Sequence, residues 1–213
     1  ALARARERGL AAYGETCPQY LLLSQAEYER PGFEGARYVC SPPLRRPEDA
    51  SALWRALGRG ELQTVATDHC PFFYHGQKDL GRERFTDIPG GLPGVEARLA
   101  LLHTFGVRAG LLSLNRWVEV CCTAPARLFG LYPRKGTLAP GADADVVIFD
   151  PELPITLSPA VLHERVDYTP YDGFTLRGYP ALTLSRGVVL ARDGRFVGPP
   201  GHGRYLRRAL WPA

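Results

Sequence analysis

The stretch ELQTVATDHCPFF (residues 61–73) places three chemically active side chains directly after an apolar segment. The apolar residues up to Val65 are typical of the end of a buried strand. Asp68, His69 and Cys70 follow within five residues. In parallel α/β folds, catalytic groups project from the carboxyl ends of the strands. A carboxylate, an imidazole and a thiol at this position therefore predict a functional site, although they do not specify its reaction.

Segments with helical and extended patterns alternate around this stretch. Residues 10–15 and 61–67 are apolar runs with polar ends, which is typical of strands in an α/β unit. The expected helices cover residues 1–9, 47–57, 93–105 and 113–120, and a shorter helix restarts after Thr123 and ends at residues 128–130. Residues 74–91 are polar and rich in glycine, which predicts a long loop of the kind that often carries function.

The pattern changes after Lys135. From there on, β-branched runs alternate with Gly and Asp turns, which predicts antiparallel strands. Asp193 and Gly194 between extended flanks predict a two-residue hairpin turn. We therefore expect two parts, an α/β part over residues 1–134 and a smaller β-rich part over residues 135–213.

The composition is that of an ordinary globular protein, with 45% hydrophobic and 23% charged residues in a chain of 213. The net charge is +4, and the basic residues are scattered except in GRYLRRALW (203–211), which we interpret as a solvated tail and not as a nucleic-acid site. No apolar run approaches the roughly 20 residues of a membrane span. The N-terminal residues are polar and do not resemble a secretory leader. We expect a cytoplasmic protein without a nucleic-acid or membrane partner.

The five cysteines show neither a CxxC motif nor regular spacing, which argues against a disulfide framework and a zinc ribbon. Reduced and mostly buried thiols are expected instead. Methionine is absent, and the chain begins within an expected helix. These two features favour a fragment or a processed piece of a longer protein.

Each candidate side chain also has an interpretation without catalysis. Asp68 could cap a turn, and His69 could bond to the backbone or to a carboxylate. Cys70 has no basic partner in the sequence, which disfavours a nucleophile. Glu15, at the end of the first expected strand, fits a simple turn acceptor better than an outer carboxylate of a metal site. Neither an HxH or HExxH pair nor a phosphate-binding glycine loop is present, so local motifs alone do not assemble a metal site.

Longer segments resemble the hydantoinase and dihydropyrimidinase branch of the cyclic amidohydrolases. They follow in the family's order over essentially the whole chain: ETCPQYLLL (15–23), CSPPLR (40–45), LWRALGRGELQTVATDHCPF (53–72), IPGGLPGVEARLALL (88–102), APARLFGLYPRKGTLAPGADADVVIFDP (124–151), RVDYTPYDGF (165–174) and LSRG (184–187). Combinations of this length are highly specific.

The resemblance implies the C-terminal part of a (β/α)8 TIM barrel followed by the C-terminal part of a small β-sandwich domain. It also implies a binuclear zinc site, whose bridging hydroxide opens a cyclic amide to an N-carbamoyl amino acid. Asp68 would be both a zinc ligand and the catalytic proton shuttle. Ser41 would contact the substrate imide, largely through its backbone, and Gly90 would stand at a second substrate contact. A zinc-bound water has its pKa lowered toward neutrality, and a nearby carboxylate can accept its proton.

Two departures from the family pattern affect these expectations. Gly90 stands where many hydantoinases carry asparagine, which leaves the substrate preference open. The family's histidine and carboxylated-lysine ligands lie upstream of the segments that match, so this chain supplies only Asp68 and is expected to be inactive alone.

The alternatives are a non-catalytic, scaffold-like homologue, or an allantoinase or dihydroorotase. The intact TDHC stretch at Asp68 argues against the scaffold, because such relatives replace this aspartate. A small cyclic amide substrate and a homo-oligomeric full-length protein complete the expectation.

Overall fold

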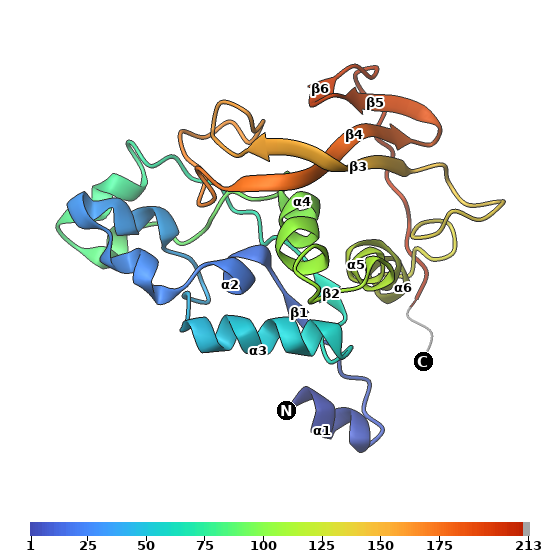
Figure 1. Cartoon of the computed structure of the whole chain (residues 1–213), viewed down its shortest axis with the longest axis horizontal. Coiled ribbons are helices and arrows are strands. Elements are labelled where there is room, and N and C mark those ends of the chain that lie inside the picture. Colours follow the sequence, from blue (N-terminus) through green and yellow to red (C-terminus); the bar gives the residue numbers. More distant parts are fainter. Residues whose placement is uncertain (211–213) are drawn as a thin grey trace.

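The computed structural model describes residues 1–210 and consists of short helices with two separate sheets (Figure 1). The α-helices are α1 (Leu2–Glu7), α2 (Pro18–Leu22), α3 (Pro47–Gly58), α4 (Arg98–Leu102), α5 (Leu114–Val118) and α6 (Ala124–Leu128). The 3-10 helices are η1 (Gln25–Glu29), η2 (Pro31–Tyr38), η3 (Lys78–Arg82) and η4 (Phe85–Asp87), and η5 (His103–Val107) and η6 (Glu119–Thr123) are π-helical turns. The strands are β1 (Glu15–Thr16), β2 (Thr64–Val65), β3 (Val146–Thr156), β4 (Thr175–Ser185), β5 (Val188–Arg192) and β6 (Arg195–Phe196).

The first sheet is a parallel pair of very short strands. Glu15 of β1 lies opposite Thr64 of β2, and α2 and α3 belong to the long connection that a parallel pair requires. The strand expected over residues 61–67 is confirmed but is shorter, whereas the one expected over residues 10–15 was misplaced, since residues 10–14 are not extended strand and β1 covers Glu15 and Thr16. Each strand pairs here only with the other, and the backbone bonds from Gln63 N–H to Gly14 O and from Ala66 N–H to Thr16 O end the ladder on either side.

Helices α1 and α3 confirm the sequence pattern. Helix α3 begins at Pro47, and Asp49 in its first turn accepts a hydrogen bond from the Arg46 N–H at 3.2 Å. Its buried side carries Trp54, whose indole N–H donates to Leu21 O at 3.0 Å. This bond ties α3 to the end of α2, next to the parallel strands.

Two helices differ from the expectation. Helix α4 begins at Arg98 and not at residue 93, and the N–H groups of Gly94 and Val95 ahead of it donate to the side chain of His69. The helix expected to restart after Thr123 does not restart, since α5, η6 and α6 run on with helical backbone angles. Pro125 has no N–H group, so one helical hydrogen bond is missing. The π-helical turn η6 ahead of it widens the helix locally and lets the helix continue past the proline.

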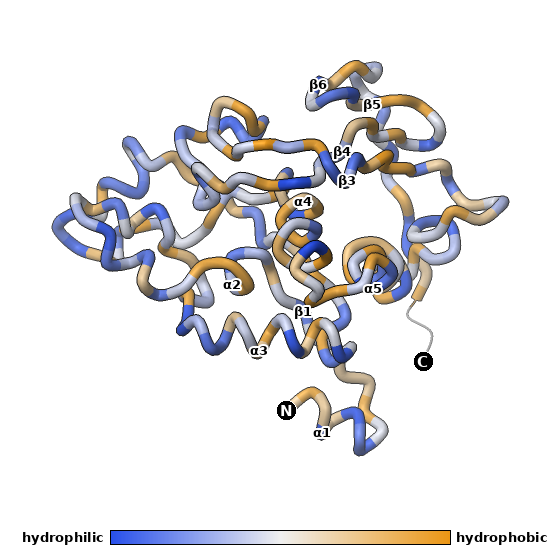
Figure 2. Tube along the Cα trace, in the orientation of Figure 1, coloured by the Kyte–Doolittle hydropathy of each residue, from blue (hydrophilic) through white to orange (hydrophobic). Residues whose placement is uncertain are grey.

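The second sheet confirms the antiparallel strands expected after Lys135. Its order is β3-β4-β5-β6, and every neighbouring pair is antiparallel. The hairpin between β5 and β6 turns at Asp193 and Gly194, with φ of 49° and 73°, as the sequence predicted. Figure 2 shows hydrophobic residues in these strands and in α2.

A continuous core connects the helices with the second sheet. It includes Leu92, which precedes α4 in the chain, Leu101 of α4 and Leu176 of β4. Among residues 1–210, no helix is long and apolar enough to span a membrane. The end of the basic tail, Trp211, lies outside the described residues.

Candidate active site at the carboxyl ends of β1 and β2

The carboxyl ends of the two parallel strands lie at the same edge of their sheet. Cys17 follows β1 directly, and Asp68 follows β2 after two connecting residues. The amide of Gln19 donates to Thr67 O at 3.2 Å and fixes the path of the chain as it leaves β2. On the strands themselves, the Glu15 carboxylate accepts a hydrogen bond from the Thr64 hydroxyl at 2.7 Å, which is the structural role expected for it.

The backbone of Asp68 has an unusual conformation. Its φ is 50°, in the left-handed region that non-glycine residues rarely occupy. The side chain is exposed, and among residues 1–210 no hydrogen bond or ion pair engages its carboxylate. Observed strain of this kind often accompanies functional positions. The chain thus presents a carboxylate that is held in a costly conformation and free to bind something else.

Buried thiols surround the base of this carboxylate. Burial, followed by the charges of Glu15 and Asp68, raises the pKa of Cys17 to about 12. Burial also raises the pKa of Cys40, where the Asp68 charge acts in the same direction. These thiols stay protonated at neutral pH, so they are inert neighbours and not nucleophiles.

Ser41 and Gly90 lie side by side. A Cβ added at Gly90 would lie 4.0 Å from the Ser41 backbone nitrogen, and the N–H of Gly91 donates to Val39 O at 3.0 Å. Both Ser41 and Gly90 are exposed, with a cis peptide bond between Ser41 and Pro42. The structure therefore brings two of the three candidate residues into direct proximity.

The segment that carries Asp68 is joined to the segment that carries Gly90. His69 pairs with Leu92 in a parallel bridge, and the Cys70 N–H donates to Leu92 O at 3.0 Å. The approach is so close that a Cβ at Gly91 would lie 2.4 Å from Cys70 O. Segments 39–41, 68–70 and 89–92 thus form one surface, the loop edge, on which all three candidates lie.

Lys78 is a constituent of this region that sequence reasoning missed. Its side chain is fully buried, and its ammonium donates to Val39 O at 2.9 Å and to Pro89 O at 3.0 Å. Burial lowers the pKa of Lys78 to about 8. Nothing in the sequence around Lys78 signalled this, because its environment comes from residues that are distant along the chain.

The histidines have structural partners. His69 accepts hydrogen bonds at Nδ1 from the N–H groups of Gly94 and Val95, at 3.1 and 3.2 Å. It therefore satisfies N–H groups ahead of α4, which is the backbone role considered for it from the sequence. His163 pairs with Glu96 at 2.9 Å, and His103 is buried against Arg177 O.

The loop edge does not by itself form a complete metal site within the described residues. Within residues 1–210, no group of three or more His, Cys, Asp or Glu side chains is arranged to hold a metal ion. The free carboxylate of Asp68 fits the oxygen ligands that zinc accepts.

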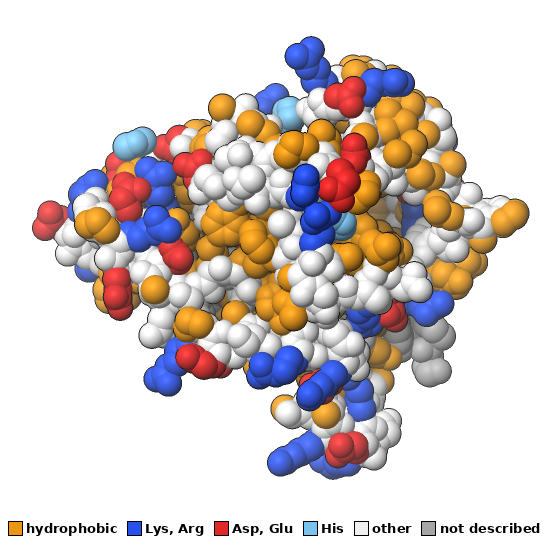
Figure 3. Space-filling view, in the orientation of Figure 1, with side chains coloured by type: hydrophobic (Ala, Val, Ile, Leu, Met, Phe, Trp, Pro, Cys, Tyr) orange, Lys and Arg blue, Asp and Glu red, His pale blue; other side chains and the backbone are white. Residues whose placement is uncertain are grey.

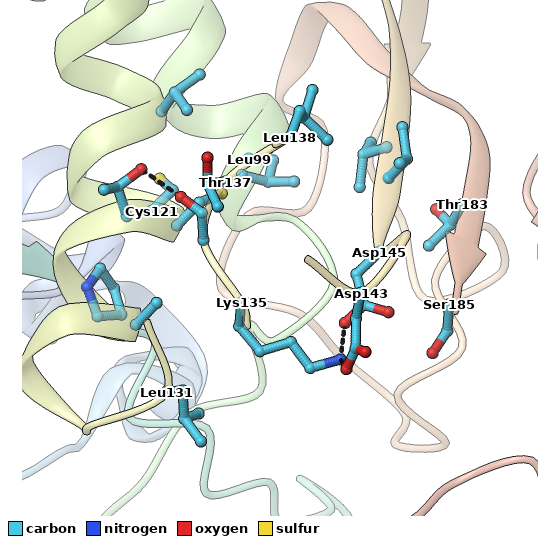
Figure 4. Close-up of a pocket in the computed structure, with 18 of the residues that line it drawn as sticks. Leu99, Cys121, Leu131, Lys135, Thr137, Leu138, Asp143, Asp145, Thr183 and Ser185 are labelled. Carbon is cyan, nitrogen blue, oxygen red and sulfur yellow. Dashed lines mark hydrogen bonds and ion pairs between the residues drawn. The ribbon is translucent and has the colours of Figure 1, made fainter. Parts of the chain in front are cut away.

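A large hollow lies elsewhere in the described part of the chain. It has a volume of about 950 Å³ and opens between α5–α6 and the strands β3 and β4 (Figure 4). We call it the apolar hollow; its walls include Trp117, Val118, Cys121, Phe129, Leu138, Val147 and Phe149, and none of the three candidate site residues. Lys135 points across its rim, where it pairs with Asp143 at 3.0 Å and with Asp145. Figure 3 shows hydrophobic side chains on the surface over the second sheet and beside it.

Comparison with known proteins identifies the family. The model of the amidohydrolase family matches residues 28–190, which is most of the chain. The chain is 51% identical to the D-hydantoinase of Streptomyces coelicolor (strain ATCC BAA-471 / A3(2) / M145) over 208 residues, and 50% identical to that of Geobacillus stearothermophilus over 212 residues. The chain belongs to the hydantoinase and dihydropyrimidinase group of the amidohydrolases. The resemblance read from the sequence is therefore confirmed.

Solved structures agree with this membership. This amidohydrolase chain superposes on dihydropyrimidinase from Brevibacillus agri NCHU1002 with a TM-score of 0.97 and 50% identity, over 100% of its own length. D-hydantoinase from a Bacillus sp. AR9 gives the same TM-score at 51% identity. The chain covers 46% of each of those two chains, and 44% and 45% of the two curated relatives. It is a mixed α/β chain that spans a little under half the length of its relatives.

Proposed function

We propose that a full-length protein containing this chain opens the ring amide of hydantoins or dihydropyrimidines and releases N-carbamoyl amino acids. The observation that carries the proposal is the free, exposed carboxylate of Asp68 at the carboxyl end of β2, on the same loop edge as Ser41 and Gly90. About 50% identity to two D-hydantoinases supports the reaction class.

In the same proposal, residues 1–134 are the C-terminal part of a TIM barrel, and residues 135–213 contribute to a small β-sandwich. The parallel pair β1–β2 and the antiparallel sheet that begins at β3 support this division. The remaining half of the full-length protein would cover the apolar hollow. The relatives carry more than half of their length outside the matched part. The hollow is lined mainly by apolar side chains, and large exposed apolar surfaces usually contact other polypeptide.

Asp68 has two roles in the proposed reaction. Its carboxylate contributes one oxygen ligand to a zinc centre whose other ligands lie outside this chain. When bound, zinc lowers the pKa of water toward neutrality and so supplies a hydroxide nucleophile. Asp68 accepts the proton of the attacking group and returns it to the ring nitrogen that leaves, a transfer that its freedom from hydrogen bonds permits.

Ser41 and Gly90 form the substrate-binding part of the loop edge. Their backbones lie close to each other and are exposed, so a planar imide can bond to backbone groups of both segments. Glycine leaves the room at position 90 that a larger side chain would fill. The chain alone is proposed to be inactive, since it supplies a single metal ligand, and the full-length protein is proposed to be a homo-oligomer.

The test is a substrate panel with a full-length, zinc-loaded protein that contains this chain. Hydantoin, dihydrouracil and both enantiomers of a 5-substituted hydantoin would be compared with allantoin and dihydroorotate, and the N-carbamoyl products quantified by chromatography. We expect the first group to be opened, with the D enantiomer preferred, because identity is higher to a D-hydantoinase structure (51%) than to the L-hydantoinase of Arthrobacter aurescens (36%). If only allantoin or dihydroorotate is opened, the proposed substrate is wrong and the protein is an allantoinase or a dihydroorotase. No turnover of any ring would favour the scaffold alternative.

A further inference from the structure

Lys78 is a buried cation that has no acidic partner among residues 1–210. Its side chain has no exposed surface, and the bonds of its ammonium go to two backbone carbonyls. Burying a charged group is costly unless polar groups compensate it. The lowered pKa, about 8, shows that two carbonyls compensate the burial only in part. The hydrogen bonds that the ammonium donates are what distinguishes this residue from a buried leucine or methionine, which would fill the same space without a charge.

The two carbonyls belong to the segments that carry the proposed substrate contacts. Val39 lies two residues before Ser41, and Pro89 lies directly before Gly90. Val39 O also accepts the Gly91 N–H, so one carbonyl joins both segments to the lysine. Lys78 therefore bridges the two segments, beside the direct backbone bond between Gly91 and Val39.

The third segment of the loop edge also lies near the ammonium. Cys40 of the Ser41 segment and Cys70 of the Asp68 segment are both close enough to Lys78 to interact with it electrostatically. Lys78 thus lies where all three segments of the loop edge converge.

The loop that carries Lys78 is itself firmly held. The Asp167 carboxylate accepts the N–H groups of Tyr74 and His75 at 2.7 and 3.0 Å, and the Lys78 N–H donates to Phe73 O at 3.1 Å. Because the backbone on this side is fixed, the ammonium can impose its position on the carbonyls that it contacts.

We propose that Lys78 is a positioning residue for substrate recognition, which sets the spacing of Ser41 and Gly90 through the carbonyls of Val39 and Pro89. It touches neither the substrate nor the reacting atoms. The inference rests on the proposed function for its kinetic consequence, whereas its structural part can be tested without any activity.

The structural part is tested by amide hydrogen exchange on the full-length protein that contains this chain, with Lys78→Met, which keeps a side chain of similar length and removes the donors. We expect at least tenfold faster exchange at Gly91 and Cys70, whose N–H groups bond to Val39 and Leu92. Amides of α3 and of the β3–β4 pair would be unchanged. The chain has only one other lysine, so Lys135→Met is the matched control and should leave the loop edge unaffected. Unchanged exchange at Gly91 and Cys70 would overturn the inference.

The kinetic part uses the full-length, zinc-loaded protein with the same two variants. Loosening of the substrate contacts predicts a KM raised at least tenfold for Lys78→Met, with kcat and zinc content within about threefold of the wild type. Lys135→Met should leave both constants unchanged. A loss confined to kcat, or no change in KM despite faster exchange, would contradict a role in substrate positioning.

Conservative replacement gives an independent arm if Lys78→Met does not fold. Lys78→Arg keeps a cation with several N–H donors and should recover the protection of Gly91 and a KM within about threefold of the wild type. A protected loop edge combined with a KM as high as that of a donor-free variant would count against the proposal. If the wild-type protein opens no ring at all, the proposed function fails, and the exchange experiment still decides the structural part.

Discussion

The two lysines of the chain mark two regions of opposite character. Lys78 is buried at the loop edge, bonds to two carbonyls, and has its pKa lowered by burial. Lys135 lies at the rim of the apolar hollow and pairs with Asp143 and Asp145; these carboxylates outweigh its partial burial and raise its pKa. The first lysine joins backbone segments inside the loop edge, whereas the second forms ion pairs at a solvent-accessible surface.

The difference shows which part of the protein this chain completes by itself. At the loop edge, backbone groups of three distant segments bond to one another and to Lys78. The hollow, in contrast, has apolar walls with side chains such as Leu138 largely exposed, at 79%. The loop edge is therefore held together by bonds within these residues, whereas the hollow leaves large apolar side chains exposed.

Removing a large side chain from each region should give the largest difference. Leu92 is 3% exposed and pairs with the Asp68 segment, so Leu92→Ala creates a cavity at the loop edge. We expect it to lower the free energy of unfolding by about 2–5 kcal/mol. Leu138→Ala at the hollow should change it by less than about 0.5 kcal/mol. Urea denaturation of both variants measures this, and equal losses would erase the distinction between the regions.

A pair of neighbouring glycines tests how tightly the loop edge is packed. A Cβ at Gly91 meets the carbonyl oxygen of Cys70 at 2.4 Å, whereas one at Gly90 has only ordinary contacts at 4.0 Å. Gly91→Ala should therefore cost about 1–3 kcal/mol of stability. Gly90→Ala serves as the control, with an expected change under about 0.5 kcal/mol. If both variants melt at the wild-type temperature, the close approach of the two segments is wrong.

The burial of Lys78 predicts a pH dependence of stability. Below pH 8 the amine is protonated in both states; between pH 8 and its ordinary pKa of 10.5 the folded chain releases a proton that the unfolded chain retains. Rising pH therefore stabilises the wild type relative to Lys78→Met, by about 1 kcal/mol between pH 7 and pH 9. Comparing the two proteins cancels the opposite effect of buried thiols such as Cys17. Parallel stability curves would show that the amine is not buried.

The ion pairs of Lys135 should have the smallest effect. They lie at a partly exposed rim, so Lys135→Met is expected to reduce stability by less than about 1 kcal/mol, and added salt should shrink the difference. Thermal melts at low and at high salt measure it. A loss as large as that of Leu92→Ala would mean that the rim of the hollow is as tightly built as the loop edge.

The sequence predicted local features well where local chemistry decides them. The acidic first turn after Pro47 and the Asp193-Gly194 hairpin appear as expected, because each depends on residues within a few positions. The helix across Pro125 was wrongly divided. A proline usually ends a helix, but here the preceding π-turn absorbs the missing donor within a longer packed helix.

The candidate site was predictable only in part. Asp68 could be located because it follows an apolar strand, and the family resemblance supplied Ser41 and Gly90. Lys78 could not be found, since its burial arises only when segments 39–41 and 89–92 meet around it. Such contacts between distant segments leave no periodic pattern in the sequence.

The central claim, that Asp68 carries the proton transfer at the loop edge, is tested most directly by turnover of the Asp68→Asn variant in the full-length, zinc-loaded protein. The variant keeps the size of the side chain and removes the proton acceptor. We predict that kcat for hydantoin falls about 100-fold or more, while Asp143→Asn at the hollow keeps wild-type turnover. A kcat for Asp68→Asn within about threefold of the wild type would contradict the account.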